Sequence, residues 1–279
     1  MKKSIKSIIL LSLISLPVAA DIKLTFGIYT SDKATAMVKQ FRPVLNALES
    51  QIANKIGEPV QIKMQISKNY EQGLDSLIKG DVDFSRFGPA SYVLAKQKDP
   101  DIKLLAMENN KGSKTFNGVI CVEKNSEITS VTQLEGKTFA FGDQNSTIGR
   151  YLSQTYLADH QITSQDLNYF EYLGRHDKVG SAVANKQFDA GALKESTYKK
   201  LVNNGASLRI IASFQNVTKP WIASSMLDDK LAQALQESLL ELSDPKALKA
   251  IKKDGFLEGT DSDYEKIRLA MSDKRFFSN

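Results

Sequence analysis

The chain has 279 residues, with 37 Lys and Arg against 32 Asp and Glu, a formal net charge of +5, and one cysteine. That length is enough for two ordinary domains. A single cysteine excludes an internal disulfide, and the apolar run at residues 118–122 predicts a small buried side chain at Cys121. No basic stripe with interleaved aromatic residues is present, which argues against nucleic-acid binding.

The first 20 residues have the pattern of a secretory signal peptide. Three lysines precede a mostly apolar run at residues 8–16, and residues 17–20 supply small side chains before a predicted cleavage site at Asp21. The run is shorter than the ~20 residues that span a bilayer, so we expect removal rather than anchoring. No cysteine stands beside this site to carry a lipid, so a soluble periplasmic protein is expected. Without the three lysines, 34 basic residues would face 32 acidic ones, a net charge of +2.

Short β-like runs alternate with longer helical stretches after residue 21, which is typical of α/β domains with mainly parallel sheets. Met37, Phe41, Leu45 and Leu48 recur at spacings of three and four, which supports the first helix. In this part the sequence predicts strands at 23–29, 60–66, 83–87 and 103–107, and helices at 34–56, at 72–79 and from Pro89 onward.

The same plan repeats in the second part. The sequence predicts strands at 139–142, 167–172, 189–193 and 208–212, helices at 147–159 and 177–185, and then a strand at 221–225 with helices at 229–242 and 245–253. The polar segment 108–115 and the segment 215–220 are predicted connections between two similar lobes. Two connections indicate a hinge, with a cleft between the lobes. We expect lobe I to comprise residues 21–110 and 217–279, and lobe II residues 111–216.

A predicted helix N-terminus in the first lobe suits an anion. In open α/β sheets, ligands lie beyond the carboxyl ends of the strands, where helix N-termini point. Pro89 at the first helical position lacks only an N–H that would be unpaired anyway. The N–H groups of Ala90, Ser91 and Tyr92 are expected to face a ligand, with the Ser91 and Tyr92 hydroxyls nearby.

The matching helix start in the second lobe has Ser146, Thr147 and Ile148. Backbone donors and the helix dipole together make such termini natural sites for an oxyanion. Ordinary helix capping explains either terminus alone, since Ser and Thr are common N-caps. Matching places in two opposed lobes favour a shared anion site.

Three further side chains are candidates for this cleft. His176 follows a predicted strand and could donate to a phosphoryl oxygen. Asp189 could accept the proton of a monoprotonated phosphonate or of a phosphate hydroxyl, which would disfavour sulfate; a structural carboxylate that caps a turn is the alternative. Glu195, placed in the following loop, could meet a cationic substituent such as an amino group.

Several segments, in this order, resemble the phosphonate-, phosphite- and phosphate-binding periplasmic components of ABC transporters: residues 83–92, 139–143, 146–152, 174–179, 188–195, 255–256 and 260–264. The resemblance implies the type II periplasmic-binding-protein fold, an α/β fold of two mixed, mainly parallel sheets with a hinge and an interlobe cleft. It also implies an inner-membrane permease as partner, a monomer, and no cofactor or metal. The cleft ligands that it implies are Tyr29, Tyr92, Ser146, Thr147, His176 and Asp189.

Three functions fit these residues. The first is capture of phosphonate, phosphite or phosphate in the cleft and delivery to a permease. The second is the same binding, reported to a membrane sensor kinase or chemoreceptor. The third is a hydrolase built on Ser146, His176 and Asp189, but Ser146 lacks a G-x-S-x-G elbow. Metal and nucleotide motifs are missing from the sequence, so a non-enzymatic binding protein is predicted.

Overall fold

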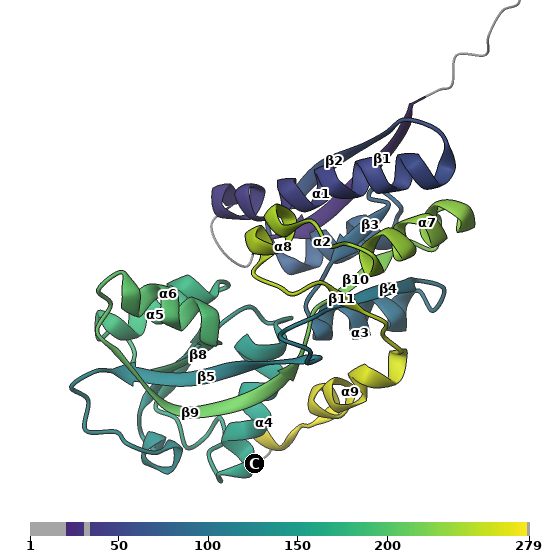
Figure 1. The fold of residues 1–279 in the computed structure, drawn as a ribbon. Helices are drawn as coiled ribbons and strands as arrows, with labels where there is room; N and C mark the ends of the chain where they lie inside the picture. The colour runs from purple at the N-terminus through teal and green to yellow at the C-terminus, as the bar shows by residue number, and fades with distance from the viewer. Residues whose placement is uncertain (1–20, 31–33, 278–279) are drawn as a thin grey trace, which may run out of the picture.

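The structure, a computed structural model, describes residues 21–30 and 34–277. The chain forms two lobes, each built on one sheet (Figure 1). Residues of both lobes line a cleft between them. The predicted signal peptide lies outside the described residues. Among the helices that are described, none combines the length and apolar character needed to cross a bilayer.

The sheet of lobe I has the strand order β11-β4-β10-β3-β1-β2. Strands β1 and β2, and β1 and β3, pair in parallel, whereas β10 is antiparallel to its neighbours. Trp221 is fully buried on this sheet and stacks on Phe26 with 5.0 Å between ring centroids. The elements of the lobe are β1 (Ile22–Tyr29), α1 (Ala34–Ile56), β2 (Val60–Ser67), α2 (Tyr70–Ile78), β3 (Phe84–Arg86), α3 (Pro89–Lys98), β4 (Lys103–Glu108), β10 (Pro220–Ala223), α7 (Asp229–Leu240), α8 (Pro245–Ile251) and β11 (Phe256–Leu257).

The sheet of lobe II has the order β7-β6-β8-β5-β9. Strand β6 pairs in parallel with β7 and β8, and β5 pairs antiparallel with β8 and β9. The elements are β5 (Thr115–Glu123), η1 (Val131–Leu134), β6 (Thr138–Phe141), the π-helical turn η2 (Thr147–Tyr151), α4 (Leu152–Asp159), β7 (Tyr169–Tyr172), α5 (His176–Ala184), β8 (Ala190–Lys194), α6 (Glu195–Asn203) and β9 (Leu208–Val217). The predicted α/β architecture with two mixed sheets is confirmed.

The chain passes between the sheets from β4 to β5 and returns from β9 to β10. The two connecting segments lie side by side. The Thr218 N–H donates to the Lys114 carbonyl at 2.7 Å, and the Glu108 N–H donates to the Lys219 carbonyl at 3.1 Å. Paired in this way, the two connections form a short hinge.

The end of the chain crosses between the lobes once more. After η3 (Asp261–Tyr264), helix α9 (Glu265–Ser272) contacts α3 of lobe I and α4 of lobe II. The next turn, η4 (Arg275–Phe277), buries Phe276 in the core of lobe II, 5.5 Å from the ring of Phe141 and 5.8 Å from that of Phe170. The expected assignment of 217–279 to lobe I therefore does not hold for residues 275–277.

Helix α6 and the length of β9 differ from the sequence prediction. Glu195 begins a helix rather than lying in a loop, and only Thr197 of that helix is buried. A helix with so few buried positions has no apolar periodicity to reveal it. Strand β9 continues to residue 217 because its second half keeps pairing with β5 from Thr115 onward.

Candidate ligand-binding site between the lobes

The two helix N-termini expected to bind an anion meet across the cleft. Helix α3 follows β3 in lobe I, and the helix formed by η2 and α4 follows β6 in lobe II. The Ala90 N–H at the start of α3 donates to Thr147 Oγ1 at 2.8 Å, and both residues are buried. The two predicted helix starts therefore meet between the lobes, where this hydrogen bond joins them.

A small cavity, here called the inner pocket, lies beside this contact and is lined by Thr147. Its volume is about 10 Å³, close to the minimum that one water molecule needs. An oxyanion held between the lobes must therefore take the place of the Ala90–Thr147 hydrogen bond. The described residues that line the pocket are Tyr70, Gly88, Pro89, Phe116, Ser146, Thr147, Ile148, His176, Lys194, Asn216 and Lys219.

In lobe I, two hydroxyl groups stand directly behind Gly88. Tyr29 Oη accepts the Gly88 N–H at 2.6 Å and shares a hydrogen bond with Ser91 Oγ at 3.0 Å. Burial raises the pKa of Tyr29 to about 12, so the phenol keeps its proton at neutral pH. A Cβ on Gly88 would lie 3.1 Å from Tyr29 Oη and 3.7 Å from Thr147 Oγ1, so the missing side chain leaves these oxygens room to approach the site.

Replacing Tyr29 with phenylalanine tests this network. We expect Tyr29→Phe to lower the free energy of unfolding by about 1–3 kcal/mol, because the buried Gly88 N–H loses its acceptor. Affinity for an oxyanion bound between the helix starts should also fall, by about tenfold, because Tyr29 orients the start of α3. Urea unfolding and calorimetry measure the two effects. Tyr169→Phe is the matched control, since Tyr169 is 53% exposed and its hydroxyl donates to Glu171 at the surface; equal behaviour of the two variants would contradict the role of Tyr29.

In lobe II, Ser146 caps the helix that begins at Thr147. Its Oγ accepts the Gly149 N–H at 2.9 Å, and its carbonyl accepts the Arg150 N–H at 3.0 Å. The first amides of a helix have no partner within the helix, which leaves those of Thr147 and Ile148 at the cleft. This start lies close against the end of β6, because a Cβ on Gly149 would lie 2.7 Å from the Gly142 Cα.

His176 is also placed as the sequence predicts. It is the first residue of α5, is 4% exposed and lines the inner pocket with Ser146 and Thr147. The preceding residue, Arg175, forms a two-pronged ion pair with Asp177, with bonds of 2.9 and 2.8 Å, which fixes the turn into the helix. The imidazole can therefore reach an oxyanion bound between the two helix starts.

Tyr92 does not belong to the inner pocket. Its N–H donates to the Gly88 carbonyl inside α3 at 3.0 Å, so it is not available to a ligand. Its hydroxyl donates to Asp261 at 2.7 Å, and its ring packs on Tyr264 with 4.6 Å between centroids. Each helical residue turns the side chain by about 100°, which carries Tyr92 toward the C-terminal helix. The prediction that Tyr92 contacts the ligand is corrected accordingly.

Asp189 lies at the opposite edge of the lobe II sheet. Its carboxylate accepts both the N–H and the hydroxyl of Thr138, each at 2.8 Å. These residues precede or begin the parallel strands β8 and β6, whereas the site lies at the carboxyl ends of the strands. The prediction that Asp189 faces an oxyanion is therefore wrong, and the structural alternative describes its contacts.

Glu195 lies in the cleft but outside the inner pocket. It begins α6, and its carboxylate forms an ion pair with Lys199 at 2.6 Å, which compensates its charge in the absence of a ligand. Glu195 also lines a second, wider cavity.

Sequence reasoning missed five residues of the inner pocket: Tyr70, Phe116, Lys194, Asn216 and Lys219. Tyr70 begins α2 and stacks on Tyr29 with 3.9 Å between ring centroids. Asn216 is 2% exposed, and its Oδ1 has no hydrogen-bond partner among the described residues. Asn216 lies near the end of β9 and Lys219 in the return connection, and the sequence indicated both only as part of a linker at residues 215–220. The signal in the sequence that could have indicated these two residues was a short polar segment between two predicted strands, at the hinge.

The two lobes, their paired connections and the cavities between them define the type II periplasmic-binding-protein fold. The family described as the phosphonate periplasmic substrate-binding protein of ABC transporters matches residues 26–264, and the chain belongs to this family. Within the described residues, no group of three or more His, Cys, Asp or Glu side chains is placed to hold a metal ion.

Relatives agree with this assignment. The chain is 25% identical over 252 residues to the probable ABC transporter phosphite binding protein PhnD1 of Prochlorococcus marinus, covering 84% of this chain and 81% of that one. It is 27% identical over 183 residues to the phosphonates-binding periplasmic protein of Escherichia coli, covering 64% and 52%. The structure of PhnD1 in complex with methylphosphonate superposes with a TM-score of 0.79 at 22% identity, over 90% of this chain and 96% of the other.

Proposed function

We propose that this protein captures a small phosphorus oxyanion, namely a phosphonate, phosphite or phosphate, in the inner pocket and delivers it to an ABC permease. The observation that carries the proposal is the contact of Ala90 N–H with Thr147 Oγ1, where two helix N-termini point at one buried position. A phosphoryl oxygen can accept from both groups at once. The relatives that are named for phosphite and phosphonates support the same ligand class.

The helix dipoles and hydrogen-bond donors of the inner pocket can together supply the free energy that binding requires. Micromolar affinity corresponds to about −8 kcal/mol. Each helix dipole contributes up to ~2 kcal/mol in a partly buried site, and each hydrogen bond to a charged oxygen about 1.5–3 kcal/mol. Two dipoles with the hydroxyls of Ser146 and Thr147 and the imidazole of His176 reach that value. The same contacts bridge both lobes, so binding favours the closed arrangement that a permease recognises.

Discrimination against sulfate rests on Asn216. No acidic residue is among the described residues that line the inner pocket, so Asp189 cannot accept a ligand proton there. The buried Oδ1 of Asn216 lacks a donor, and the hydroxyl of a monoprotonated phosphonate or phosphate can supply one. Sulfate has no proton at neutral pH and would leave this acceptor unsatisfied.

Location and assembly complete the proposal. The family is periplasmic, and we place cleavage of the signal peptide before Asp21, which releases a soluble chain without a lipid. The chain acts as a monomer that presents its closed form to an inner-membrane permease, and it binds without catalysing a reaction. The lobes comprise residues 21–110 with 217–274, and 111–216 with 275–277.

Calorimetry on protein purified from the periplasm tests this function. Methylphosphonate, 2-aminoethylphosphonate, phosphite, phosphate and sulfate are compared at one pH and salt concentration. We expect at least one phosphorus oxyanion to bind with about micromolar affinity or better, and sulfate to bind more weakly than all of them. Tighter binding of sulfate, or no binding of any phosphorus oxyanion, would overturn the proposal. The mass of the purified chain reports the cleavage site.

A further inference from the structure

A second, much larger cavity adjoins the inner pocket. This outer chamber has a volume of about 580 Å³ and lies between α6 of lobe II and the α1 and α8 region of lobe I. Phe116, Lys194 and Lys219 line both cavities, so the two are direct neighbours. A substituent on a phosphorus atom held in the inner pocket would extend into the outer chamber.

The outer chamber is strongly cationic. Seven basic side chains line it against the two acids Glu108 and Glu195, a net charge of +5. The whole chain of 279 residues carries the same formal charge of +5. Both acids already have partners within the chamber, because Glu108 lies 2.7 Å from Arg86 and Glu195 lies 2.6 Å from Lys199. These two pairs leave the lining, with its other lysines, at a net charge of +5.

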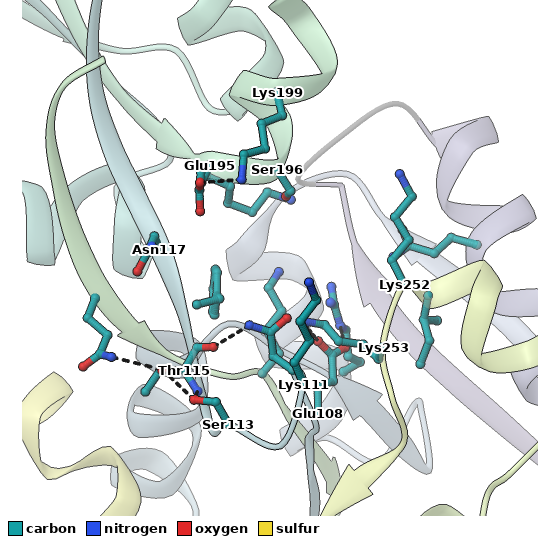
Figure 2. A pocket seen from close by; sticks show the side chains of 18 of the residues that line it. Glu108, Lys111, Ser113, Thr115, Asn117, Glu195, Ser196, Lys199, Lys252 and Lys253 are labelled. Carbon is teal, nitrogen blue, oxygen red and sulfur yellow. Dashed lines mark hydrogen bonds and ion pairs between the residues drawn. The ribbon is translucent and has the colours of Figure 1, made fainter. Parts of the chain in front are cut away.

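These lysines come from both lobes and surround one space. Figure 2 shows Lys199 beside Glu195 on one side, with Lys111, Lys252 and Lys253 on the other. Lys253 Nζ lies 5.8 Å from the centre of the Phe116 ring and 3.8 Å from Glu108. Burial lowers the pKa of Lys253, which indicates an environment poorer in water than the free surface. Charge interactions are stronger in such surroundings.

We propose that the preferred ligand carries a second anionic group, a carboxylate or a further phosphoryl, which the lysines of the outer chamber bind while the inner pocket holds the first phosphoryl group. This inference rests on the proposed function and specifies its substrate class. It also reverses the earlier expectation that Glu195 meets a cationic substituent, because an amino group would enter a chamber that is itself positively charged.

Electrostatic steering is the alternative role for the lysines. Steering raises the association rate of every anion, but it does not make the anionic end of a substituent bind more tightly than a neutral end. Equilibrium constants for ligands that differ only at that end therefore separate the two roles.

The test measures dissociation constants by calorimetry for methylphosphonate, 3-phosphonopropionate, butylphosphonate, 2-aminoethylphosphonate and methylenediphosphonate. Because several lysines share the second anion, we expect 3-phosphonopropionate or methylenediphosphonate to bind about tenfold more tightly than butylphosphonate, and 2-aminoethylphosphonate to bind most weakly. Methylphosphonate binding without any anionic preference would overturn this inference alone. Failure of all phosphonates to bind would overturn the proposed function as well.

A double variant assigns the preference to the chamber. Lys111→Gln with Lys252→Gln removes two exposed cations from it. The ratio of the butylphosphonate and 3-phosphonopropionate dissociation constants should fall from about ten to below about three. Lys124→Gln, an exposed lysine that is not among the lining residues, should keep the ratio of the wild type. An unchanged ratio in the double variant would contradict the proposal.

Discussion

Methylphosphonate affinity is expected to fall about 100-fold or more when Ser146 and Thr147 are both replaced by alanine. Each hydroxyl that donates to a charged oxygen is worth about 1.5–3 kcal/mol, so two correspond to about 3–6 kcal/mol. Thr147 Oγ1 lies at the meeting point of the two helix N-termini, and Ser146 shapes the turn that presents it. Calorimetry at a fixed salt concentration measures the loss.

A fold check and a matched control accompany this variant. Loss of the Ser146 cap costs about 1 kcal/mol, so the double variant should keep a cooperative melting transition. Ser130 and Thr132 form a comparable exposed hydroxyl pair in lobe II, 2.9 Å apart and not among the residues of the inner pocket. Their double replacement by alanine should leave binding unchanged. If the Ser146–Thr147 variant bound methylphosphonate within about threefold of the wild-type affinity, the role of these hydroxyls in ligand binding would be contradicted.

Glu108→Gln is expected to lower the free energy of unfolding by about 3–5 kcal/mol, because removing one partner leaves buried cations uncompensated. Glu108 is 1% exposed at the end of β4 and bonds Arg86 at 2.7 Å, with Lys253 at 3.8 Å. Urea unfolding at pH 7 measures this effect. Glu241→Gln is the control, since that carboxylate pairs with Lys55 but is 62% exposed, and surface pairs contribute at most about 1 kcal/mol.

The pH dependence gives the same prediction a second readout. Burial alone would raise the pKa of Glu108, but Arg86, then Lys253 and Lys219, hold it below its ordinary value of 4.5. A carboxyl whose pKa is lower in the folded state contributes stability above its unfolded pKa and loses it as pH falls through the folded pKa. The difference between wild type and Glu108→Gln should therefore be full at pH 7 and shrink below about pH 4.5. A constant difference down to pH 3 would contradict the assignment.

Local patterns predicted the fold and the meeting of two helix starts. The strands other than β5 and β11, and the helix starts at Pro89 and Thr147, follow from short apolar runs and from the residues that end them. Because parallel strands end at one edge of a sheet, the side chains that follow them gather there. Tyr29, Ser91, Ser146, Thr147, Ile148 and His176 lie together for that reason.

The errors concern residues whose place depends on distant packing. Tyr92 turns toward the C-terminal part of the chain, more than 160 positions away, where Asp261 accepts a hydrogen bond from its hydroxyl. Asp189 precedes its strand rather than following it, a distinction that the pattern around 187–193 does not make. Asn216 and Lys219 line the inner pocket because the chain returns toward lobe I beside it. No local sequence pattern indicates this position.

The C-terminal crossing restricts how a solute can get in and out. Helix α9 packs Ile267 and Ala270 into one apolar cluster with Tyr92 of lobe I and Leu152 of lobe II, and Phe276 is buried further along in lobe II. Separating the lobes along this flank would expose apolar surface to water, whereas the flank between α6 and α8 is lined by charged groups that are readily hydrated. The cleft should therefore open on the flank between α6 and α8, where the lysines of the outer chamber lie, and solutes should enter and leave on that side.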